Sequence, residues 1–544
     1  MLFLLTAAAL ACAPWCNIHT CNKGDCSDCE HCKHWEMNTL CEPWCNVHTC
    51  YDKRCAGCKI CAKETDAPAS NISAATPAAA STRTAAPPGW GCCADREAKA
   101  CDACRWWANG GFCTKHAVNC ATCGFALYCS DPSTTPPPAP PAPPPAIPVD
   151  LRCQSGRLVE CRSSSSSGGS SSSCGEFLIK GVSWYGMEEK YAILQGLEKV
   201  SMDHLLNFIE HHGFNSVRVP LAVTSVLSDP PSSMFGGMVS QLNPHVHGFN
   251  YLAVLDTLIT EAARRNLLIL LDMHRLTAGD RNNPLWHDHN VHEEKLVSAW
   301  EMLAKRHCDS WNVIGADLFN EPWAASWGGA SNGGPPHEDW AAAAERIGNL
   351  VSTMCPRWLL FVEGVSHTTA SGAPSAGPGQ SDYGHNWASN LEGVRTRPLK
   401  LATAEQQSKL VLSPHIYGPS VAPQPYFDAS GFPSNMPQIW DAHFGFASSK
   451  EHGMCIVIGE WGGWFAANDA IWQKAFGAYL SKRQIGHFYW ALNPTSRDTG
   501  GLVLADWHTP NEQKLTLLKS MPATSVGMAT HEHHKHGHEG KPSR

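Results

Sequence analysis

The stretch Val313-Ile-Gly-Ala-Asp-Leu-Phe-Asn-Glu321 decides the fold of the larger part of this 544-residue chain. Residues Val313 to Phe319 are mostly apolar, and a run without polar alternation is typical of a strand that is buried on both faces of a parallel sheet. Two polar residues, Asn320 and Glu321, end the run. The stretch therefore predicts a parallel strand that carries functional groups at its carboxyl end.

Similar runs lie on either side of this strand, and amphipathic segments separate them. The eight predicted strands are 177–184, 216–219, 267–273, 313–319, 358–362, 410–412, 455–458 and 487–490. The amphipathic segments, which we expect to be helices, include 203–212, 250–265, 292–307 and 340–354. This alternation over residues 150–522 predicts a (β/α)8 TIM barrel of the α/β class.

Polar and aromatic residues collect at the predicted carboxyl ends of these strands. The ends carry Trp184, Arg218, Asp272, His274, Asn320, Glu321, Glu363, His415, Tyr417, Glu460 and Trp490. Enzymes with a TIM barrel place their active sites at this face of the barrel. We therefore expect the functional site there.

Glu321 and Glu460 supply the two carboxyl groups that cleavage of a glycosidic bond requires. One carboxylic acid protonates the leaving oxygen, and one carboxylate acts at the anomeric carbon. The two residues end the fourth and the seventh predicted strands, which face each other across a closed barrel, so their side chains can converge. A carboxyl separation of about 5 to 5.5 Å would indicate a retaining mechanism through a covalent glycosyl-enzyme.

Residues 150–520 resemble a catalytic domain of glycoside hydrolase family 5, and within it the secreted endo-β-1,4-glucanases. The resemblance is carried by Gly181-Val-Ser-Trp-Tyr-Gly186, Val217-Arg-Val-Pro220, Leu271-Asp-Met-His-Arg275, Phe319-Asn-Glu-Pro322, Phe361-Val-Glu-Gly364, Pro414-His-Ile-Tyr417, Ile458-Gly-Glu-Trp-Gly462 and Trp490-Ala-Leu-Asn-Pro494. Each motif alone is weakly specific. Their joint order and spacing along a barrel is strongly specific.

The resemblance implies a role for each matching residue. Glu321 is expected to be the general acid/base and Glu460 the nucleophile. Asn320 is expected to hydrogen-bond the 2-hydroxyl of the sugar at the cleavage point. Arg218 and Tyr417 are expected to hold Glu460 ionised and oriented, because a charge partner and a hydrogen-bond donor both favour the carboxylate.

Further residues are expected to contact the sugar. His274 and His415 would bind hydroxyls and tune the two glutamates, and Trp490 would stack under the cleaved ring. The family also places aromatic residues that line the cleft at Trp184, Trp286, Trp327 and Trp387, although a tryptophan can equally fill a core. Glu363 matches the family without a role that we can derive, and we expect a buried, hydrogen-bonded carboxylate.

The resemblance leaves the target glycan open, because one fold and one pair of glutamates serve many glycans. A β-mannanase or a β-1,3-glucanase is the alternative enzyme. A catalytically inert carbohydrate-binding wall protein is the alternative from a different class. Inert relatives tend to lose one carboxylate, whereas both glutamates are present here, so the sequence favours an enzyme.

The first 149 residues have a different composition. Residues 1–11 are a short apolar run, which we expect to be a signal peptide. Twenty of the 26 cysteines lie before residue 130. The spacing of Cys12, Cys16, Cys21, Cys26, Cys29 and Cys32 recurs from Cys41 to Cys61, which predicts two tandem Cys-rich repeats over 12–63. Export favours disulfides in these repeats, and zinc binding is the alternative.

Low-complexity segments separate the predicted modules. Residues 64–89 are expected to be a linker, 90–129 a third Cys-rich module, and 130–149 a Pro-rich linker. The Ser-rich segment 163–173 is expected to be a loop between two strands, closed by Cys161 and Cys174. Residues 523–544 are expected to be a solvated His-rich tail, with metal binding as the alternative.

The composition limits the partners. A net charge of −8, with 17% charged residues, provides no basic face for nucleic acid. We expect no membrane span, and the sequence carries no nucleotide, haem or flavin signature, so no cofactor or metal is expected. The sequence thus predicts a monomeric enzyme, secreted to the extracellular space or cell wall, that acts on a β-glucan such as cellulose, with Cys-rich modules that bind carbohydrate or cell wall.

Overall fold

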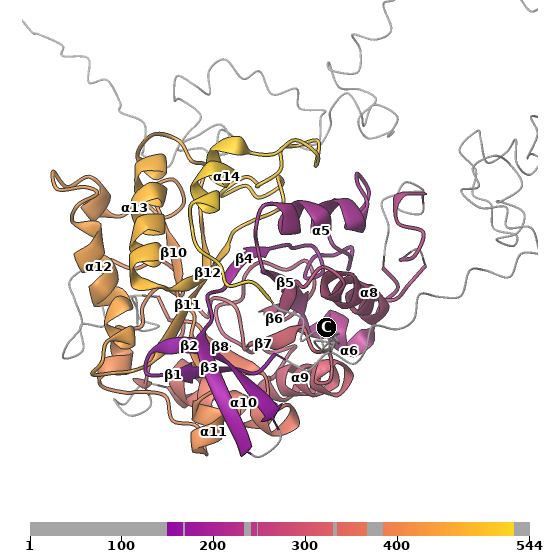
Figure 1. Ribbon diagram of the computed structural model, residues 1–544, viewed down its shortest axis with the longest axis horizontal. Helices are drawn as coiled ribbons and strands as arrows, with labels where there is room; N and C mark the ends of the chain where they lie inside the picture. The colour runs from indigo at the N-terminus through magenta and orange to yellow at the C-terminus, as the bar shows by residue number, and fades with distance from the viewer. Residues whose placement is uncertain are drawn as a thin grey trace, which may run out of the picture. The chain divides into compact units, whose positions relative to one another are not determined.

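The structure is a computed structural model of the 544-residue chain, and it describes residues 149–166, 169–232, 241–246, 248–329, 335–366 and 384–526 (Figure 1). These residues belong to one compact unit, Pro140–Arg544. The predicted signal peptide, the three Cys-rich modules and their linkers lie outside the described residues, and so does most of the predicted tail.

Parallel strands form a closed barrel. In chain order they are β4 (Lys180–Ser183), β5 (Ser216–Ala222), β6 (Leu268–Arg275), β7 (Val313–Asp317), β8 (Leu359–Val362), β9 (Leu410–Leu412), β10 (His415–Tyr417), β11 (Cys455–Gly462) and β12 (Gly486–Tyr489). The pairing of β12 with β4 closes the cylinder. Both β9 and β10 pair with β11, so together they fill the sixth of eight positions. The predicted (β/α)8 barrel is confirmed.

Helices surround these strands (Figure 1). The α-helices are α5 (Met202–His211), α6 (Val223–Ser228), α8 (Tyr251–Ala263), α9 (Glu293–His307), α10 (Trp340–Met354), α11 (Ala404–Gln407), α12 (Met436–His443), α13 (Ala467–Arg483) and α14 (Glu512–Lys519). Short 3-10 helices span Pro336–Glu338, Glu392–Arg395, Pro425–Phe427 and Gly445–Ser448. Side chains cap some of the helix starts: the hydroxyl of Ser201 accepts from His204 N, and the carboxylate of Asp339 accepts from Ala342 N.

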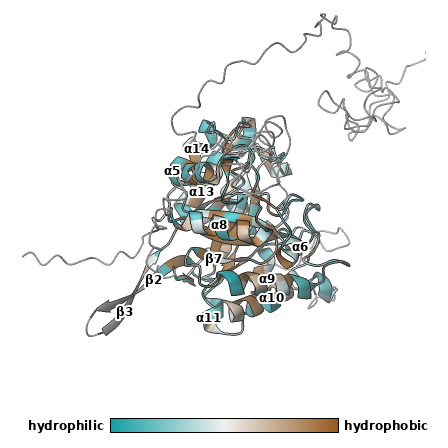
Figure 2. Cartoon of the chain, turned by 90° about the vertical axis from the view of Figure 1, so that its right-hand side faces the viewer, coloured by the Kyte–Doolittle hydropathy of each residue, from teal (hydrophilic) through white to brown (hydrophobic). Residues whose placement is uncertain are grey.

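Side-chain alternation along β6 separates the inside of the barrel from its helix-facing side. Ile269 and Leu271 belong to the large cluster that the helices share, and Figure 2 shows the apolar strand β7 among helices of mixed polarity. Leu268 and Leu270 belong to a second cluster. Its other members include Ile314, Leu359, Phe361, Val411, Val457 and Phe488, which come from strands around the barrel. The interior is therefore packed, as is usual for this fold.

A separate three-stranded antiparallel sheet precedes the barrel. It consists of β1 (Leu151–Gln154), β2 (Arg157–Ser166) and β3 (Gly169–Glu176). The prediction that 163–173 form a loop is wrong, because the β2–β3 ladder continues to the pair Ser166 and Gly169. Cross-strand pairing uses backbone groups, so a polar low-complexity run can extend it. The predicted bridge between Cys161 and Cys174 is confirmed, and it fixes the register of this hairpin.

The last described residues are part of the barrel domain. Thr524 N donates to Leu178 O at 3.0 Å, and Leu178 N donates to the hydroxyl of Thr524 at 2.8 Å. Asn215 also donates to Thr524 O at 2.9 Å. Thr524, two residues past the boundary that we predicted after residue 522, thus contacts the segment just before β4.

Within the described ranges, no helix combines the length and the apolar character that crossing a membrane requires. The same residues contain three disulfides, Cys153–Cys455, Cys161–Cys174 and Cys308–Cys355. The last of these joins the carboxyl-terminal ends of α9 and α10 on the outside of the barrel.

We expect the double variant Cys308→Ala/Cys355→Ala to lose about 2 to 4 kcal/mol of unfolding free energy, because this bridge joins residues 47 positions apart. Denaturant unfolding followed by tryptophan fluorescence measures the loss. The matched control is Cys161→Ala/Cys174→Ala, whose bridge spans 13 positions within a hairpin that can open locally. Equal unfolding midpoints for wild type and the first variant would contradict the expectation.

Candidate active site

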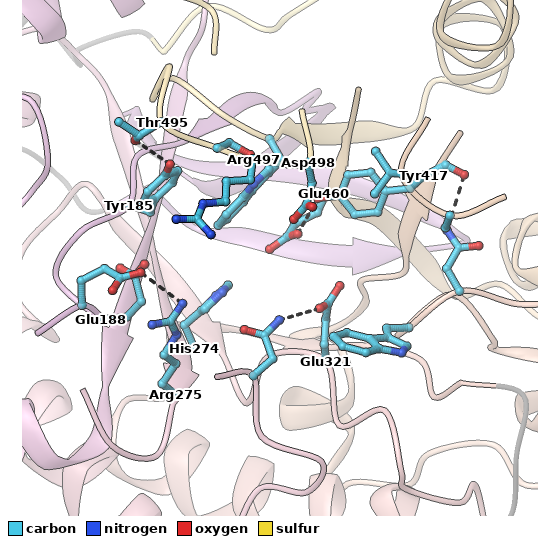
Figure 3. Close-up of a pocket in the computed structure, with 18 of the residues that line it drawn as sticks. Tyr185, Glu188, His274, Arg275, Glu321, Tyr417, Glu460, Thr495, Arg497 and Asp498 are labelled. Carbon is cyan, nitrogen blue, oxygen red and sulfur yellow. Dashed lines mark hydrogen bonds and ion pairs between the residues drawn. The ribbon is translucent and has the colours of Figure 1, made fainter. Parts of the chain in front are cut away.

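The residues at the carboxyl ends of the strands converge on one cleft of about 820 Å³ (Figure 3). Along β6, alternation puts Asp272 and His274 on the same face as Leu270, inside the barrel and at its carboxyl end. In Figure 3 the carboxylates of Glu321 and Glu460 point toward each other across the cleft. The predicted strand-end site is therefore a real cavity with polar walls.

Two donors hold the carboxylate of Glu460 in β11. Arg218 Nη1 donates to Oε1 at 2.6 Å, and the hydroxyl of Tyr417 donates to Oε2 at 2.7 Å. The parallel pairing of β10 with β11 sets His415 opposite Glu460, and Tyr417 follows two residues later on the same face. Both carboxylate oxygens are therefore fixed in orientation before any sugar binds.

Arg218 of β5 is fully buried and contacts three further carboxylates. Its Nε lies 2.9 Å from Asp317, and its Nη2 lies 3.1 Å from Asp272 and 3.2 Å from Glu363. Nη2 also donates to Oδ1 of Asn320 at 3.0 Å. Burial alone would lower the pKa of Arg218, but the carboxylates around it raise that pKa well above its usual value. The guanidinium therefore stays charged.

Glu321 lies just beyond β7 with a φ of 43°, in the left-handed region that non-glycine residues rarely adopt. Its backbone N–H donates to Oε2 of Glu363 at 2.7 Å. Its Oε1 lies 3.0 Å from Nδ1 of His415, and its Oε2 accepts from Nδ2 of Asn282 at 3.0 Å. Such backbone strain costs about 1 to 3 kcal/mol and persists where the surroundings hold it.

His415 lies among three carboxylates. Its Nε2 is 3.1 Å from Glu363, and its Nδ1 is 3.6 Å from Glu460 as well as close to Glu321. Burial alone would lower the pKa of His415, but the charges of Glu363 and Glu460 raise it well above its usual value. Burial would raise the pKa of Glu321, whereas the hydrogen bond and charge of His415 lower it. These contacts therefore favour the carboxylate form of Glu321.

The two glutamates are close enough to act on one glycosidic bond. One carboxyl oxygen of Glu321 and one of Glu460 lie within 4.8 Å of each other. Retaining glycosidases have carboxyl groups about 5 to 5.5 Å apart, and inverting ones have them about 6.5 to 9.5 Å apart to admit a water. The approach of these oxygens lies nearer to the retaining range than to the inverting one.

Stacked rings form another wall of the cleft. The ring of Trp490 lies 5.5 Å from that of His274 and 5.3 Å from that of Tyr185, in both cases nearly parallel. Nδ1 of His274 lies 2.7 Å from Oδ2 of Asp272. Burial lowers the pKa of His274 well below its usual value, so the ring is neutral. With Nδ1–H donated to Asp272, Nε2 can accept a hydroxyl proton.

Two of the predicted aromatic residues do not line the cleft. Trp184 is 0% exposed, and its indole donates to Gln195 O at 2.9 Å. Trp286 is also 0% exposed, donates to Glu293 at 2.7 Å and packs on Trp340. The prediction that these two indoles contact the sugar is therefore wrong for this structure, because both lie in the core.

The other two predicted aromatic residues differ from each other. Trp327 packs on the core, and its indole donates to Arg397 O at 2.9 Å. It is not among the residues that line the cleft. Trp387 is 46% exposed and does line the cleft. Trp323, which the sequence did not single out, stacks behind it with ring centroids 5.5 Å apart.

Sequence reasoning also missed polar residues of the site. Asp317 lies inside an apolar strand, where an acidic residue is itself a signal of a buried charge partner. Asn282 lies in the loop between β6 and α9, where no periodic pattern points to it. Tyr185 lies in a recognised motif, but only the structure reveals its ring beside Trp490.

In the part of the chain that the structure describes, three groups of His and carboxylate side chains bring ligand atoms within 4.8 Å of one another. They are Glu321, His415 and Glu460; Asp317, Glu363 and His415; and His385, Glu392 and His443. The first two belong to the network already described. In the third, Arg395 lies 3.6 Å from Glu392 and competes with any cation, so we assign no metal to these groups.

This arrangement defines a class. Two opposed glutamates at the carboxyl ends of barrel strands, one held by an arginine and a tyrosine and the other by a histidine, match the pair of carboxyl groups that a glycosidase requires. The stacked rings beside them suit the apolar face of a sugar.

Comparison with known proteins gives the family. The model of cellulase (glycosyl hydrolase family 5) matches residues 177–496. The chain is 37% identical over 358 residues to an endoglucanase of Paenibacillus polymyxa, which covers 65% of this chain and 85% of that protein. It is 33% identical over 352 residues to the major extracellular endoglucanase of Xanthomonas campestris pv. campestris, a match that covers 64% of this chain and 68% of that protein. The chain therefore belongs to glycosyl hydrolase family 5 and is a glycoside hydrolase.

Solved structures agree with this assignment. A cellotetraose complex of an endocellulase from Pyrococcus horikoshii matches with a TM-score of 0.60 and 34% identity, covering 68% of this chain and 98% of that one. The catalytic domain of the Xanthomonas campestris pv. campestris enzyme matches with a TM-score of 0.58 and 31% identity over the same shares.

We expect Tyr417→Phe to lower kcat for glycoside hydrolysis by about 100-fold, because it removes one of the two donors that hold Glu460. Steady-state kinetics measure the loss. Tyr185→Phe is the matched control, because its hydroxyl contacts Thr495 at 2.7 Å rather than either glutamate, and it should change KM more than kcat. A wild-type kcat in Tyr417→Phe would contradict the role.

Proposed function

We propose that this protein is a secreted, retaining endo-β-1,4-glucanase that hydrolyses cellulose or a related β-glucan by double displacement. The observation that carries the proposal is the approach of Glu321 and Glu460, whose nearest carboxyl oxygens lie within 4.8 Å while each side chain has its own donors. Such a spacing supports direct attack by the second carboxylate rather than attack by a water placed behind the sugar.

In the first step Glu460 attacks the anomeric carbon, and Glu321 donates a proton to the leaving glycosidic oxygen. Arg218 and Tyr417 hold Glu460 with the donor geometry described above, so little reorganisation is required during attack. Asn320, which Arg218 holds through its Oδ1, is oriented toward the sugar 2-hydroxyl in this scheme. The product is a covalent glycosyl ester of Glu460 and a free shorter chain.

In the second step Glu321 removes a proton from water as the water oxygen attacks the anomeric carbon; the bond between that carbon and Glu460 breaks, and Glu460 leaves as the carboxylate. Two nearby carboxylates disfavour ionising together, so the charge of Glu460 helps Glu321 keep a proton in the first step. Formation of the ester removes that charge. With that charge gone, the pKa of Glu321 falls at the stage when a base is required.

Several observations support the choice of a β-1,4-glucan. Relatives that are 33 to 37% identical are named endoglucanases, and a solved structure with 34% identity is a complex with cellotetraose. In the cleft, the exposed indole of Trp387 and the ring of Trp490 offer apolar faces that suit the flat sides of glucose rings.

Secretion is part of the proposal. One relative is named an extracellular endoglucanase, and the described residues contain three disulfides, which are typical of oxidising compartments. Binding of carbohydrate or cell wall by the Cys-rich modules, and the monomeric state, remain predictions from the sequence.

We expect Glu460→Gln to abolish hydrolysis of every substrate, because no nucleophile remains. Glu321→Ala should lose activity on cellulose but still release dinitrophenol from 2,4-dinitrophenyl β-cellobioside, since that leaving group requires no proton. Added azide should accelerate its turnover and yield β-cellobiosyl azide, because an anion requires no general base. Kinetics and NMR of the product measure this.

The azide experiment separates the two roles. A β-azide product in Glu321→Ala assigns the acid/base to Glu321, whereas azide that takes the place of the missing carboxylate in Glu460→Ala should give the α-azide. The opposite pattern, or full activity in Glu460→Gln, would overturn the proposed roles.

We expect the full chain to hydrolyse carboxymethyl cellulose, with a rapid fall in viscosity relative to the release of reducing ends, as internal cleavage produces. Laminarin and mannan, assayed at equal concentration, should be hydrolysed more slowly. A higher kcat/KM on laminarin or mannan would replace the proposed substrate with β-1,3-glucan or β-mannan and leave the glutamate roles intact.

A further inference from the structure

The side chain of Asn282 makes the second polar contact of the catalytic carboxyl group Glu321. Its Nδ2 donates to Oε2 at 3.0 Å, which is the hydrogen bond drawn at Glu321 in Figure 3. Oε1 of the same carboxyl group lies 3.0 Å from His415. His415 is fully buried, so Oε1 contacts a side chain of the barrel interior. Oε2 instead contacts Asn282, which lines the cleft.

The backbone that carries Asn282 is fixed on both sides. Leu276 N donates to Oδ1 of Asn283 at 3.0 Å, which closes the loop onto its own beginning. Ala324 N donates to Pro284 O at 3.0 Å, which ties the loop to the segment just after Glu321. These two hydrogen bonds thus fix the position of the Asn282 amide relative to the carboxyl group of Glu321.

A side-chain amide is suited to a group that changes its protonation state. Its nitrogen donates only, and its oxygen accepts only. In the observed orientation the amide nitrogen faces Oε2, and this arrangement stabilises the carboxylate form of Glu321 relative to the acid form. Asn282 lines the cleft itself, so it lies beside the place where the leaving oxygen and the attacking water must pass.

We propose that Asn282 is a positioning residue that sets the working pKa of Glu321 and orients its Oε2 for both proton transfers. This inference rests on the proposed acid/base role of Glu321. The amide favours the carboxylate that the second step requires, and so it limits the pH range in which the first step finds Glu321 protonated.

The test is the pH dependence of kcat/KM and kcat of the full chain on 2,4-dinitrophenyl β-cellobioside and on a cello-oligosaccharide. For the oligosaccharide, the alkaline limb of kcat/KM reports loss of the proton from Glu321 in the free enzyme. Asn282→Ala removes the donor, so this limb should move up by about 1 pH unit. Asn282→Asp keeps the shape but replaces the donor with a like charge, so the limb should move further up.

A second readout separates this role from packing. With the dinitrophenyl substrate, kcat is limited by the step that uses Glu321 as a base, and both variants should lower it several-fold near neutral pH. Asn386→Ala is the matched control, because that amide also lines the cleft but its Nδ2 lies near Tyr417 O, at 3.5 Å, and the control's alkaline limb should coincide with that of wild type.

The outcomes are distinct. An unmoved limb in both Asn282 variants, while Glu321→Gln loses hydrolysis of the oligosaccharide, would overturn this inference alone. A Glu321→Gln variant that hydrolyses the oligosaccharide with the wild-type limb would instead overturn the proposed acid/base role of Glu321. Thermal unfolding of each variant verifies that the comparison is made between folded enzymes.

Discussion

The ion pairs of the buried Arg218 guanidinium are the interaction on which the rest of the site depends. It lies 2.6 Å from Glu460 and also contacts Asp272, Asp317 and Glu363, all at or below 5% side-chain exposure. Burial raises the pKa of Asp272 and of Asp317 to about 7 and that of Glu363 well above its usual value, and the charge of Arg218 opposes each of these shifts. A guanidinium suits the position because it is planar, donates in several directions and keeps its charge.

Contacts of Arg218 lead to both glutamates that we propose to be catalytic, Glu321 and Glu460. On one side it fixes an oxygen of Glu460 directly. On the other side it pairs with Glu363, whose second oxygen accepts the backbone N–H of Glu321 at 2.7 Å, so one carboxylate links the two halves of the site. His415 completes the link through contacts with Glu363 and Glu321. Glu363, for which the sequence suggested no role, thus supports the strained backbone at Glu321.

The positions of most site residues could be predicted because each barrel strand has an apolar pattern whose end can be located in the sequence. The runs that end at Arg218, Glu321 and Glu460 have clear apolar patterns, and parallel pairing then requires their ends to meet at one face. What the pattern does not encode is the direction of a large side chain. Trp184 follows β4 directly, and only packing decides that its indole enters the core instead of the cleft.

Residues outside regular elements were harder to predict for a related reason. Asn282 lies in a loop whose shape depends on Asn283 and on a bond to Ala324, and neither contact leaves a periodic signal. The prediction for the Ser-rich segment 163–173 was wrong for a different reason. Composition suggested a loop, whereas the backbone pairing fixed by Cys161 and Cys174 continues the strands. Local composition could not reveal either tertiary constraint.

The central claim is that Glu460 forms a covalent bond to the sugar. The most direct measurement is inactivation of the full chain with 2,4-dinitrophenyl 2-deoxy-2-fluoro-β-cellobioside, followed by peptide mapping by mass spectrometry. The account predicts one added fluorocellobiosyl group, carried by Glu460 in the peptide that contains β11. An adduct on another residue, or stoichiometric release of dinitrophenol with no adduct and with an α-configured first product, would contradict it.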